Sequence, residues 1–253
     1  MSTDYKKIFT YDFFLPASEV NAQRELPLSG LVTTIIDVAT AHANHLDIGF
    51  DKMISRGISW VLSRLTIDID EMPGVGRNYR METWIESINR LFSERNFRLT
   101  DLESGKVLLK AHSVWMAINM ETRRPGELTE VFAHLDDIIV PESFGGEKGA
   151  KLAPFDNAET ETSYAFAVSD IDVNRHVTTR RYIDLITDIR PLQWYDAMRL
   201  ARFEIAFKHE AHYGETAIVS SFASGEANER IDAQISVDAT HSCIARLCFE
   251  ARK

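Results

Sequence analysis

The sequence predicts an α+β fold built from two copies of one unit. Apolar residues with helical spacing are followed by a long run of strand-like segments, this order of elements occurs twice, and short segments of the two halves match in apolar pattern. A helix followed by an antiparallel meander is typical of α+β proteins. The 253 residues are 45% hydrophobic and 26% charged, which is the composition of an ordinary globular protein.

The first half begins with a strand at residues 5–15, where aromatic and β-branched side chains end at Pro16. Apolar side chains then recur with the helical period over residues 28–45, which predicts one helix. Apolar and polar residues alternate over residues 65–70, as in a strand with one buried face. The further strands expected in this half are residues 79–88, 92–101 and 107–119.

Residues 136–160 are rich in proline, glycine and acidic residues, which is typical of a linker. We therefore expect an N-terminal domain at residues 1–135 and a C-terminal domain at residues 161–253. The second domain repeats the order of the first. Its expected elements are a strand at 162–169, a helix at 179–190 and strands near 201–209, 215–224, 229–237 and 242–251.

Two ungapped alignments of the halves test the repeat. Residues 65–76 (LTIDIDEMPGVG) lie over residues 203–214 (FEIAFKHEAHYG), an offset of 138 positions. Residues 18–23 (SEVNAQ) lie over residues 171–176 (IDVNRH), an offset of 153 positions. The larger second offset predicts about 15 extra residues after the helix of the first half, at residues 46–60.

Positions that differ between the two copies are not required by the fold, so they are candidates for chemistry. The second half has a carboxylate, Glu210, where the first half has Met72, and an imidazole, His176, where the first half has Gln23. It also has Asp172 where the first half has Glu19. Asn174 keeps its counterpart Asn21. Such groups beside a helix start could perform acid–base chemistry where negative charge develops. The ordinary alternatives are a helix cap for Asp172 or Asn174, a packed His176 and a solvated Glu210.

Charge and cysteine content exclude several classes of function. The net charge is −10, which argues against nucleic acid or an anionic membrane as the partner. Cys243 and Cys248 fall on opposite faces of one expected strand, so we expect no disulfide and a reducing, cytoplasmic location. No nucleotide-binding loop or metal-ligand pattern is present, so we expect neither a cofactor nor a metal.

Three blocks of the sequence resemble the acyl-acyl carrier protein (acyl-ACP) thioesterases of plant plastids and their bacterial relatives. The blocks are ISWVLSRLTIDIDEMPGVGRNYRMETWI (58–85), SVWMAINMETRRP (113–125) and DVNRHVTTRRYID (172–184). The resemblance implies a tandem hotdog fold, in which each half wraps an antiparallel sheet around a long central helix. It also implies that the first half shapes an acyl pocket and that the second half is catalytic. Trp60, Trp84 and Trp115 are expected in the core, where one or more could line an apolar tunnel.

The resemblance implies hydrolysis of fatty acyl-ACP thioesters to free fatty acid and holo-ACP, which ends fatty acid chain elongation. The family's D-x-N-x-H motif falls on Asp172, Asn174 and His176, and its strand glutamate falls on Glu210. Plant enzymes usually have a cysteine directly after that glutamate, and here Ala211 takes its place, so no thiol mechanism is implied there.

The roles implied for these residues leave one choice open. Glu210, with His176 as its partner, either activates a water or forms a transient acyl adduct. Asn174 positions the water or the carbonyl, and Asp172 orients the loop. We expect backbone N–H groups near Val177 and Thr178 to bind the oxyanion.

The carrier protein of this family is acidic, so a chain of charge −10 needs a local basic patch to bind it. The expected docking residues are Arg175, Arg180 and Arg181, with Arg123 and Arg124 as a second group. A solvated helix face is the alternative for these arginines. Two fused hotdog domains already pair within one chain, as two single hotdog subunits do in a dimer. We therefore expect the protein to be a monomer or a homodimer.

Three other functions remain open from the sequence. The first two are a coenzyme A thioesterase and a hydroxyacyl dehydratase, which are also hotdog enzymes acting on thioesters. The third is an acyl-binding module without catalysis. Acyl chain length cannot be predicted from spacing in the sequence.

Overall fold

The computed structural model describes residues 5–135, 137–227 and 229–252. Ten strands form one sheet in the order β1-β3-β4-β5-β2-β7-β10-β9-β8-β6, and every neighbouring pair is antiparallel. The strands of the first half are β1 (Ile8–Phe14), β2 (Ile58–Ile69), β3 (Asn78–Ile88), β4 (Phe92–Asp101) and β5 (Val107–Asn119). Those of the second half are β6 (Thr160–Ala165), β7 (Met198–Phe207), β8 (Thr216–Ser224), β9 (Arg230–Val237) and β10 (Thr240–Ala251).

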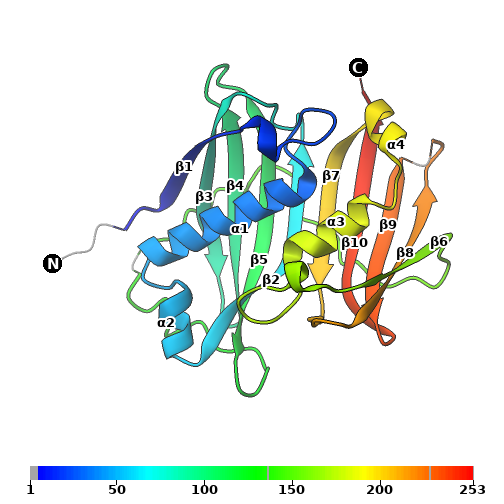
Figure 1. Ribbon diagram of the computed structural model, residues 1–253. Coiled ribbons are helices and arrows are strands. Elements are labelled where there is room, and N and C mark those ends of the chain that lie inside the picture. The colour runs from blue at the N-terminus through cyan, green and yellow to red at the C-terminus, as the bar shows by residue number, and fades with distance from the viewer. Residues whose placement is uncertain (1–4, 136, 228, 253) are drawn as a thin grey trace.

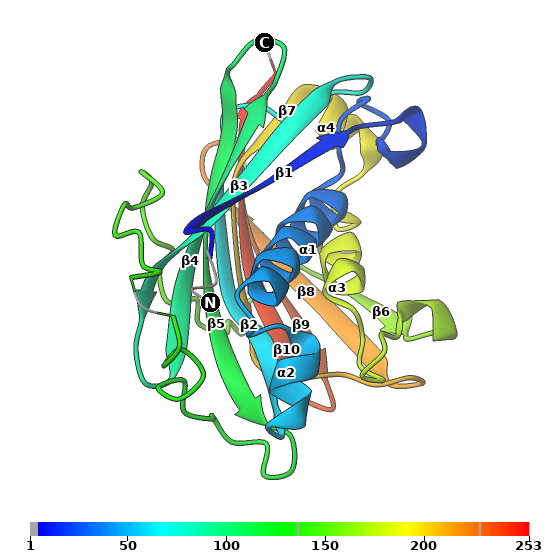
Figure 2. The same cartoon turned by 90° about the vertical axis from the view of Figure 1, so that its left-hand side faces the viewer.

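Two helices, α1 (Leu28–His45) and α3 (Thr179–Thr187), lie side by side on one face of the sheet (Figure 1). The sheet curves around them (Figure 2). Two shorter helices, α2 (Phe50–Ser55) and α4 (Leu192–Ala197), precede β2 and β7. The apolar faces of the strands and of both long helices form the main core, because each element must bury its apolar side against another. A second cluster surrounds α2 and the C-terminal end of α1. None of the described helices is both long and apolar enough to cross a membrane.

The sheet order is symmetric about its middle, where β2 of the first half pairs with β7 of the second. In this pair Thr66 lies opposite Glu204, and these two positions match under the offset of 138 found in the sequence. Equivalent residues face each other when a two-fold axis relates two antiparallel copies. The predicted α+β class and duplicated unit are therefore confirmed.

The second alignment, of SEVNAQ on IDVNRH, is wrong by two positions. In the first half the Asn21 carboxamide oxygen accepts hydrogen bonds from the backbone N–H groups of Gln23 and Glu25, at 3.1 and 3.0 Å. In the second half Asp172 accepts from the N–H groups two and four residues later, at 2.8 and 3.0 Å. Asn21 therefore matches Asp172, because Asn and Asp make the same turn. Both segments contain the dipeptide Val-Asn, at residues 20–21 and 173–174, and this identity favoured the wrong sequence alignment.

The extra residues of the first half mainly lengthen its helix instead of following it. With the corrected loop, the offset is 151 positions, and α1 and α3 begin at matched residues, Leu28 and Thr179. Subtracting the sheet offset of 138 leaves 13 extra residues, not 15. Nine of these lie in the helices themselves, since α1 has 18 residues and α3 has 9. The longer α1 covers more of the sheet in the first half (Figure 1).

The expected linker is packed against the protein. Phe144 and Leu152 are buried within it. The indole of Trp84 donates to the backbone oxygen of Glu142 at 2.8 Å, and Arg202 donates to that of Glu147 at 2.8 Å. The segment thus crosses the face of the sheet opposite the helices (Figure 2). Residue 136, its expected first residue, lies outside the described part.

Candidate active site

Asp172 organises the loop that leads into α3. Its Oδ1 accepts the N–H groups of Asn174 and His176, and its own N–H donates to the His176 backbone oxygen at 2.8 Å. Arg175 takes the left-handed conformation within this turn, with φ of 63°. The loop is therefore held by its own backbone and by the Asp172 carboxylate.

The loop is also paired with the segment that follows β7. His176 forms a β-bridge with His212, and the Val177 N–H donates to the Ala211 backbone oxygen at 2.8 Å. This pairing places His176 Nε2 3.4 Å from Glu210 Oε2. Both side chains keep some exposure, 24% and 35% respectively. An imidazole and a carboxylate at this separation can exchange a proton after a small movement.

Arg123 of the first half is a third member of this cluster, and its role was not predicted. Its Nη2 donates to the same Glu210 oxygen that faces His176. The sequence placed Arg123 only in a docking group, since the pair is separated by 87 residues. The turn after β5 reaches Glu210 because β5 pairs with β2, and β2 pairs with β7 across the two halves. No local sequence signal contains that contact.

The expected oxyanion-binding amides are occupied. The Val177 N–H donates to Ala211, and the Thr178 N–H donates to the Asp170 backbone oxygen at 2.8 Å. The expectation for these two groups is therefore wrong, because tertiary pairing of the loop uses both donors. By contrast, the Asn174 side chain is exposed and makes no hydrogen bond to any residue that the structure describes. Its amide is free to bind a carbonyl oxygen.

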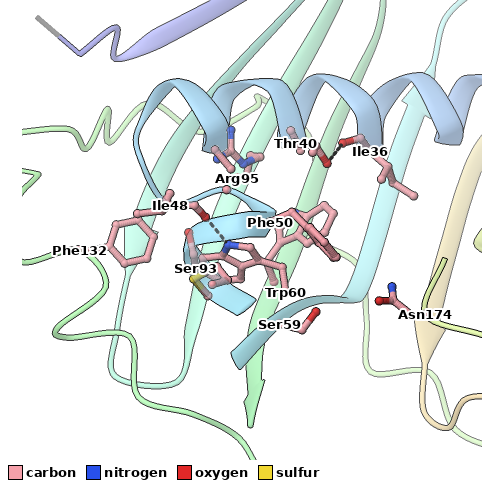
Figure 3. A pocket seen from close by; sticks show the side chains of 15 residues that line it. Ile36, Thr40, Ile48, Phe50, Ser59, Trp60, Ser93, Arg95, Phe132 and Asn174 are labelled. Atoms are coloured by element: carbon pink, nitrogen blue, oxygen red, sulfur yellow. Dashed lines mark hydrogen bonds between the residues drawn. The ribbon is translucent and has the colours of Figure 1, made fainter. Parts of the chain in front are cut away.

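A mainly apolar cavity of about 180 Å³ lies between α1 and the strands of the first half (Figure 3). Among the residues lining it are Ile36 and Ala39 of α1, Trp60 of β2 and Trp115 of β5. Among the described residues of the second half, Asn174 alone contributes to its lining. Of Trp60, Trp84 and Trp115, which the sequence analysis placed in the core, Trp60 and Trp115 thus line the cavity.

The three arginines beside the loop have different environments. Arg181 donates from Nε to Asp170 at 2.5 Å and lies over the Tyr164 ring, 5.3 Å from its centre. Burial would raise the pKa of Asp170, but hydrogen bonds from the Ala167 N–H, Arg181 and Tyr164 hold it below its ordinary value. Arg181 thus ties the loop to its neighbours. Arg175 and Arg180 are exposed, and the described structure gives them no ion pair.

Comparison with protein families matches both halves. Residues 6–135 match the acyl-ACP thioesterase N-terminal domain, and residues 155–247 match the acyl-ACP thioesterase C-terminal domain. The chain is 24% identical over 234 residues to a chloroplastic palmitoyl-acyl carrier protein thioesterase of Gossypium hirsutum, with 86% of this chain covered and 55% of the relative. The chain thus spans about half the length of this curated relative.

Solved structures agree with this assignment. An acyl-ACP thioesterase from Bacteroides thetaiotaomicron is 30% identical, with a TM-score of 0.88 and 99% and 100% of the two chains covered. The 12:0-ACP thioesterase from Umbellularia californica is 19% identical, with a TM-score of 0.89 and 98% and 95% covered, and supports the fold. The tandem hotdog fold is confirmed, and the chain belongs to the acyl-ACP thioesterase family.

Proposed function

We propose that this protein hydrolyses fatty acyl-ACP thioesters to free fatty acid and holo-ACP, and so ends fatty acid chain elongation. The observation that carries the proposal is the apolar cavity whose lining includes Asn174, a residue of the loop in which His176 faces Glu210. An acyl chain lying in the cavity would bring its thioester to these polar groups, since ligand sites combine an apolar lining with a few polar anchors. Membership of the family supports the same substrate class.

We infer that water, and not Glu210 itself, attacks the thioester. Asn174 lines the cavity whereas Glu210 does not, so we assign to Glu210 the activation of a water and not direct attack on the acyl carbon. Glu210 accepts a proton as the water oxygen bonds to that carbon, and the Asn174 amide donates to the developing oxyanion. Glu210 then gives this proton to His176, and when the carbon–sulfur bond breaks, His176 donates it to the leaving sulfur. Arg123 holds the Glu210 carboxylate in place.

The basic residues available to an acidic carrier are Arg175, Arg180 and Arg124, which are exposed. Arg181 contributes less to this patch because Asp170 binds it. Salt should weaken the interaction, since exposed charges are screened over about 10 Å at 0.1 M. We further propose a cytoplasmic location, which the free thiols of Cys243 and Cys248 support.

The experiment measures thiol release from acyl-ACP and acyl-coenzyme A with the same acyl chain, for wild type and for Glu210→Ala. We expect a higher kcat/KM for the carrier substrate and a loss of about 10²-fold or more in the variant. A higher kcat/KM with coenzyme A would favour that substrate class. A wild type that releases no thiol would overturn the proposal, and loss of water from hydroxyacyl substrates would instead indicate a dehydratase.

A further inference from the structure

A second cavity lies on the face of the sheet opposite the helices, between the strands and the segment at residues 144–152. Its volume is about 70 Å³, whereas a single water needs roughly 10–15 Å³. The covering segment crosses this face of the sheet (Figure 2). The cavity lies against β2 and β7, which join the two halves, and its lining includes none of the residues to which we assign hydrolysis.

Four polar side chains lie in one row across four strands beneath this segment. They are Asn96 of β4, His112 of β5, Thr66 of β2 and Glu204 of β7, and each lies directly opposite the next. None of the four is more than 6% exposed. Burying polar groups in this way is unfavourable unless each finds a hydrogen-bond partner.

Three atoms of this row have no hydrogen-bond partner among the residues that the structure describes: Asn96 Oδ1, His112 Nε2 and Glu204 Oε2. His112 and Glu204 also line the cavity. The other Glu204 oxygen accepts from Arg202 Nε at 2.7 Å, which fixes the carboxylate. Because native proteins satisfy most buried polar atoms, the cavity is the side from which partners for His112 and Glu204 can come.

The unpaired atoms call for hydrogen-bond donors. A carboxylate such as Glu204 can only accept. Burial and the charge of Lys148 hold the pKa of His112 below its ordinary value, so the imidazole is neutral and its Nε2 can accept. This nitrogen lies 3.8 Å from Glu94 Oε1, which is too far for a hydrogen bond. A donor between the two can reach both, so the fitting ligand has several N–H groups.

The covering segment fits closely over the row. A Cβ at Gly149 would lie only 2.3 Å from Thr66 Oγ1, so the chain can approach this closely only with glycine. Lys148 holds the segment down, with its Nζ 2.8 Å from Glu86 and 2.9 Å from Glu94. The segment therefore forms a fixed cover, and Lys148 shows that carboxylates on this face bind an ammonium group.

We propose that this cavity is a binding site for a small primary amine, bound as its ammonium ion. Glu204 supplies a negative charge, and His112 and Glu94 supply further acceptors. An ammonium group has three donors and no acceptor, which matches this set. Because the ligand would contact both halves and the covering segment, binding should stabilise the folded chain.

The test measures binding to the full chain by calorimetry and by thermal unfolding, without acyl substrate and at constant ionic strength. We expect methylammonium to bind at one site and to raise the unfolding temperature. Tetramethylammonium keeps the charge but has no N–H group, and methanol has a donor but no charge. Both should bind about tenfold or more weakly, as when a hydrogen bond to a charged group is lost.

Glu204→Gln keeps the shape of the side chain and removes its charge, so the affinity for methylammonium should fall by about tenfold or more. Glu82→Gln is the matched control. Glu82 accepts from Arg98 at 2.8 Å on the same face of the sheet but does not line the cavity, so its affinity should stay within about threefold. His112→Leu should also weaken binding, and it decides if Glu204→Gln does not fold.

Failure of methylammonium to bind at about 0.1 M, a hundred times a millimolar Kd, would overturn the inference and mean that the cavity holds only water. Equally tight binding of tetramethylammonium would contradict it, as would undiminished affinity in the folded Glu204→Gln and His112→Leu variants. A loss in these variants with Glu82→Gln unchanged would support the site. None of these outcomes depends on the proposed hydrolysis.

Discussion

The two halves of the molecule build the same loop and place different chemistry on it. In the first half, Glu25 is bound by both Nη atoms of Arg252, at 2.6 and 2.8 Å. In the second half the matched residue, His176, faces Glu210 instead. Gln23 donates to Asp196 at 2.8 Å, whereas its match Asn174 has no partner among the described residues. In the first loop both side chains are bound in structural contacts, whereas in the second loop Asn174 lines the cavity and His176 faces a carboxylate.

This comparison works as an internal control within one chain. Asn21 and Asp172 make the same hydrogen bonds in the two loops, so the fold alone accounts for them. His176, Asn174 and Glu210 have no such counterpart, since Met72 occupies the position that matches Glu210. The contrast thus separates residues that shape the loop from residues that act on a substrate.

The largest loss of activity is expected for Glu210→Met, which gives the second half the residue that the first half has at the matched position, Met72. Glu210→Met removes the carboxylate that faces His176, so kcat/KM for acyl-ACP should fall by about 10²-fold or more. The variant should fold, because a methionine already occupies the matched site. Thiol release and thermal unfolding check both points, and activity within threefold of the wild type would exclude Glu210 from the chemistry.

A smaller loss is expected at Arg123, which positions Glu210 from the other half. Arg123→Met should lower kcat by about tenfold with little change in KM, because a charge-assisted hydrogen bond is lost. Arg123→Lys should restore part of the rate. Arg124→Met is the adjacent control and should leave kcat unchanged; a loss of kcat in both variants would argue against a specific pair.

The stability of the first half should depend on pH through His42. Burial and the charge of Arg95 lower its pKa to about 3 in the folded protein, from 6.5 in the unfolded chain, so between these values only the unfolded state binds the proton. The free energy of unfolding should therefore fall as pH drops from 6.5 towards 3, by up to about 1.4 kcal/mol per pH unit from this group. Denaturant unfolding of His42→Gln should show a shallower pH dependence than the wild type.

The control for that measurement is His209→Gln, which changes an exposed histidine. It should keep the wild-type slope over the same pH range. Carboxylates such as Asp170 also lose stability in acid, because their pKa is lowered in the fold, but they contribute equally to all three proteins. Identical slopes for His42→Gln and wild type would show that the buried imidazole is not neutral.

The smallest effect is expected for Asp172→Asn. Asparagine already makes this turn at position 21, so the variant should keep the loop, and kcat/KM should stay within about threefold. Asp172→Ala should lose the turn and be less stable by about 1 kcal/mol. A drop of more than tenfold in folded Asp172→Asn would mean that the negative charge itself takes part in the reaction.

The sequence predicted the fold class and the repeat because these depend on periodic patterns within each half. The strand alignment placed Thr66 over Glu204, and the structure puts them face to face. The loop alignment failed because a two-residue identity outweighed the turn chemistry that Asn21 and Asp172 share. The expected linker packs against the protein because Phe144 and Leu152 are buried, although its overall composition is typical of an unpacked linker.

The candidate site could be predicted only where its members lie in one motif. Asp172, Asn174 and His176 occupy one short loop, and Glu210 was found by matching the halves. Arg123 could not be assigned in this way, because its contact with Glu210 joins the turn after β5 to the segment after β7, which are 87 residues apart in the sequence. The Val177 amide was misjudged for the same reason, since its acceptor, Ala211, lies after β7, whereas the Thr178 amide is used locally by Asp170.

The most direct test of the account replaces a matched pair of residues, His176 of the second loop and Glu25 of the first, with glutamine. Fatty acid release from acyl-ACP is measured for His176→Gln and Glu25→Gln. We expect about a 10²-fold loss in the first. The second should keep activity within about threefold while unfolding at a lower temperature, because the pair with Arg252 is weakened. Equal losses of activity, or an active His176→Gln, would contradict the division of roles between the halves.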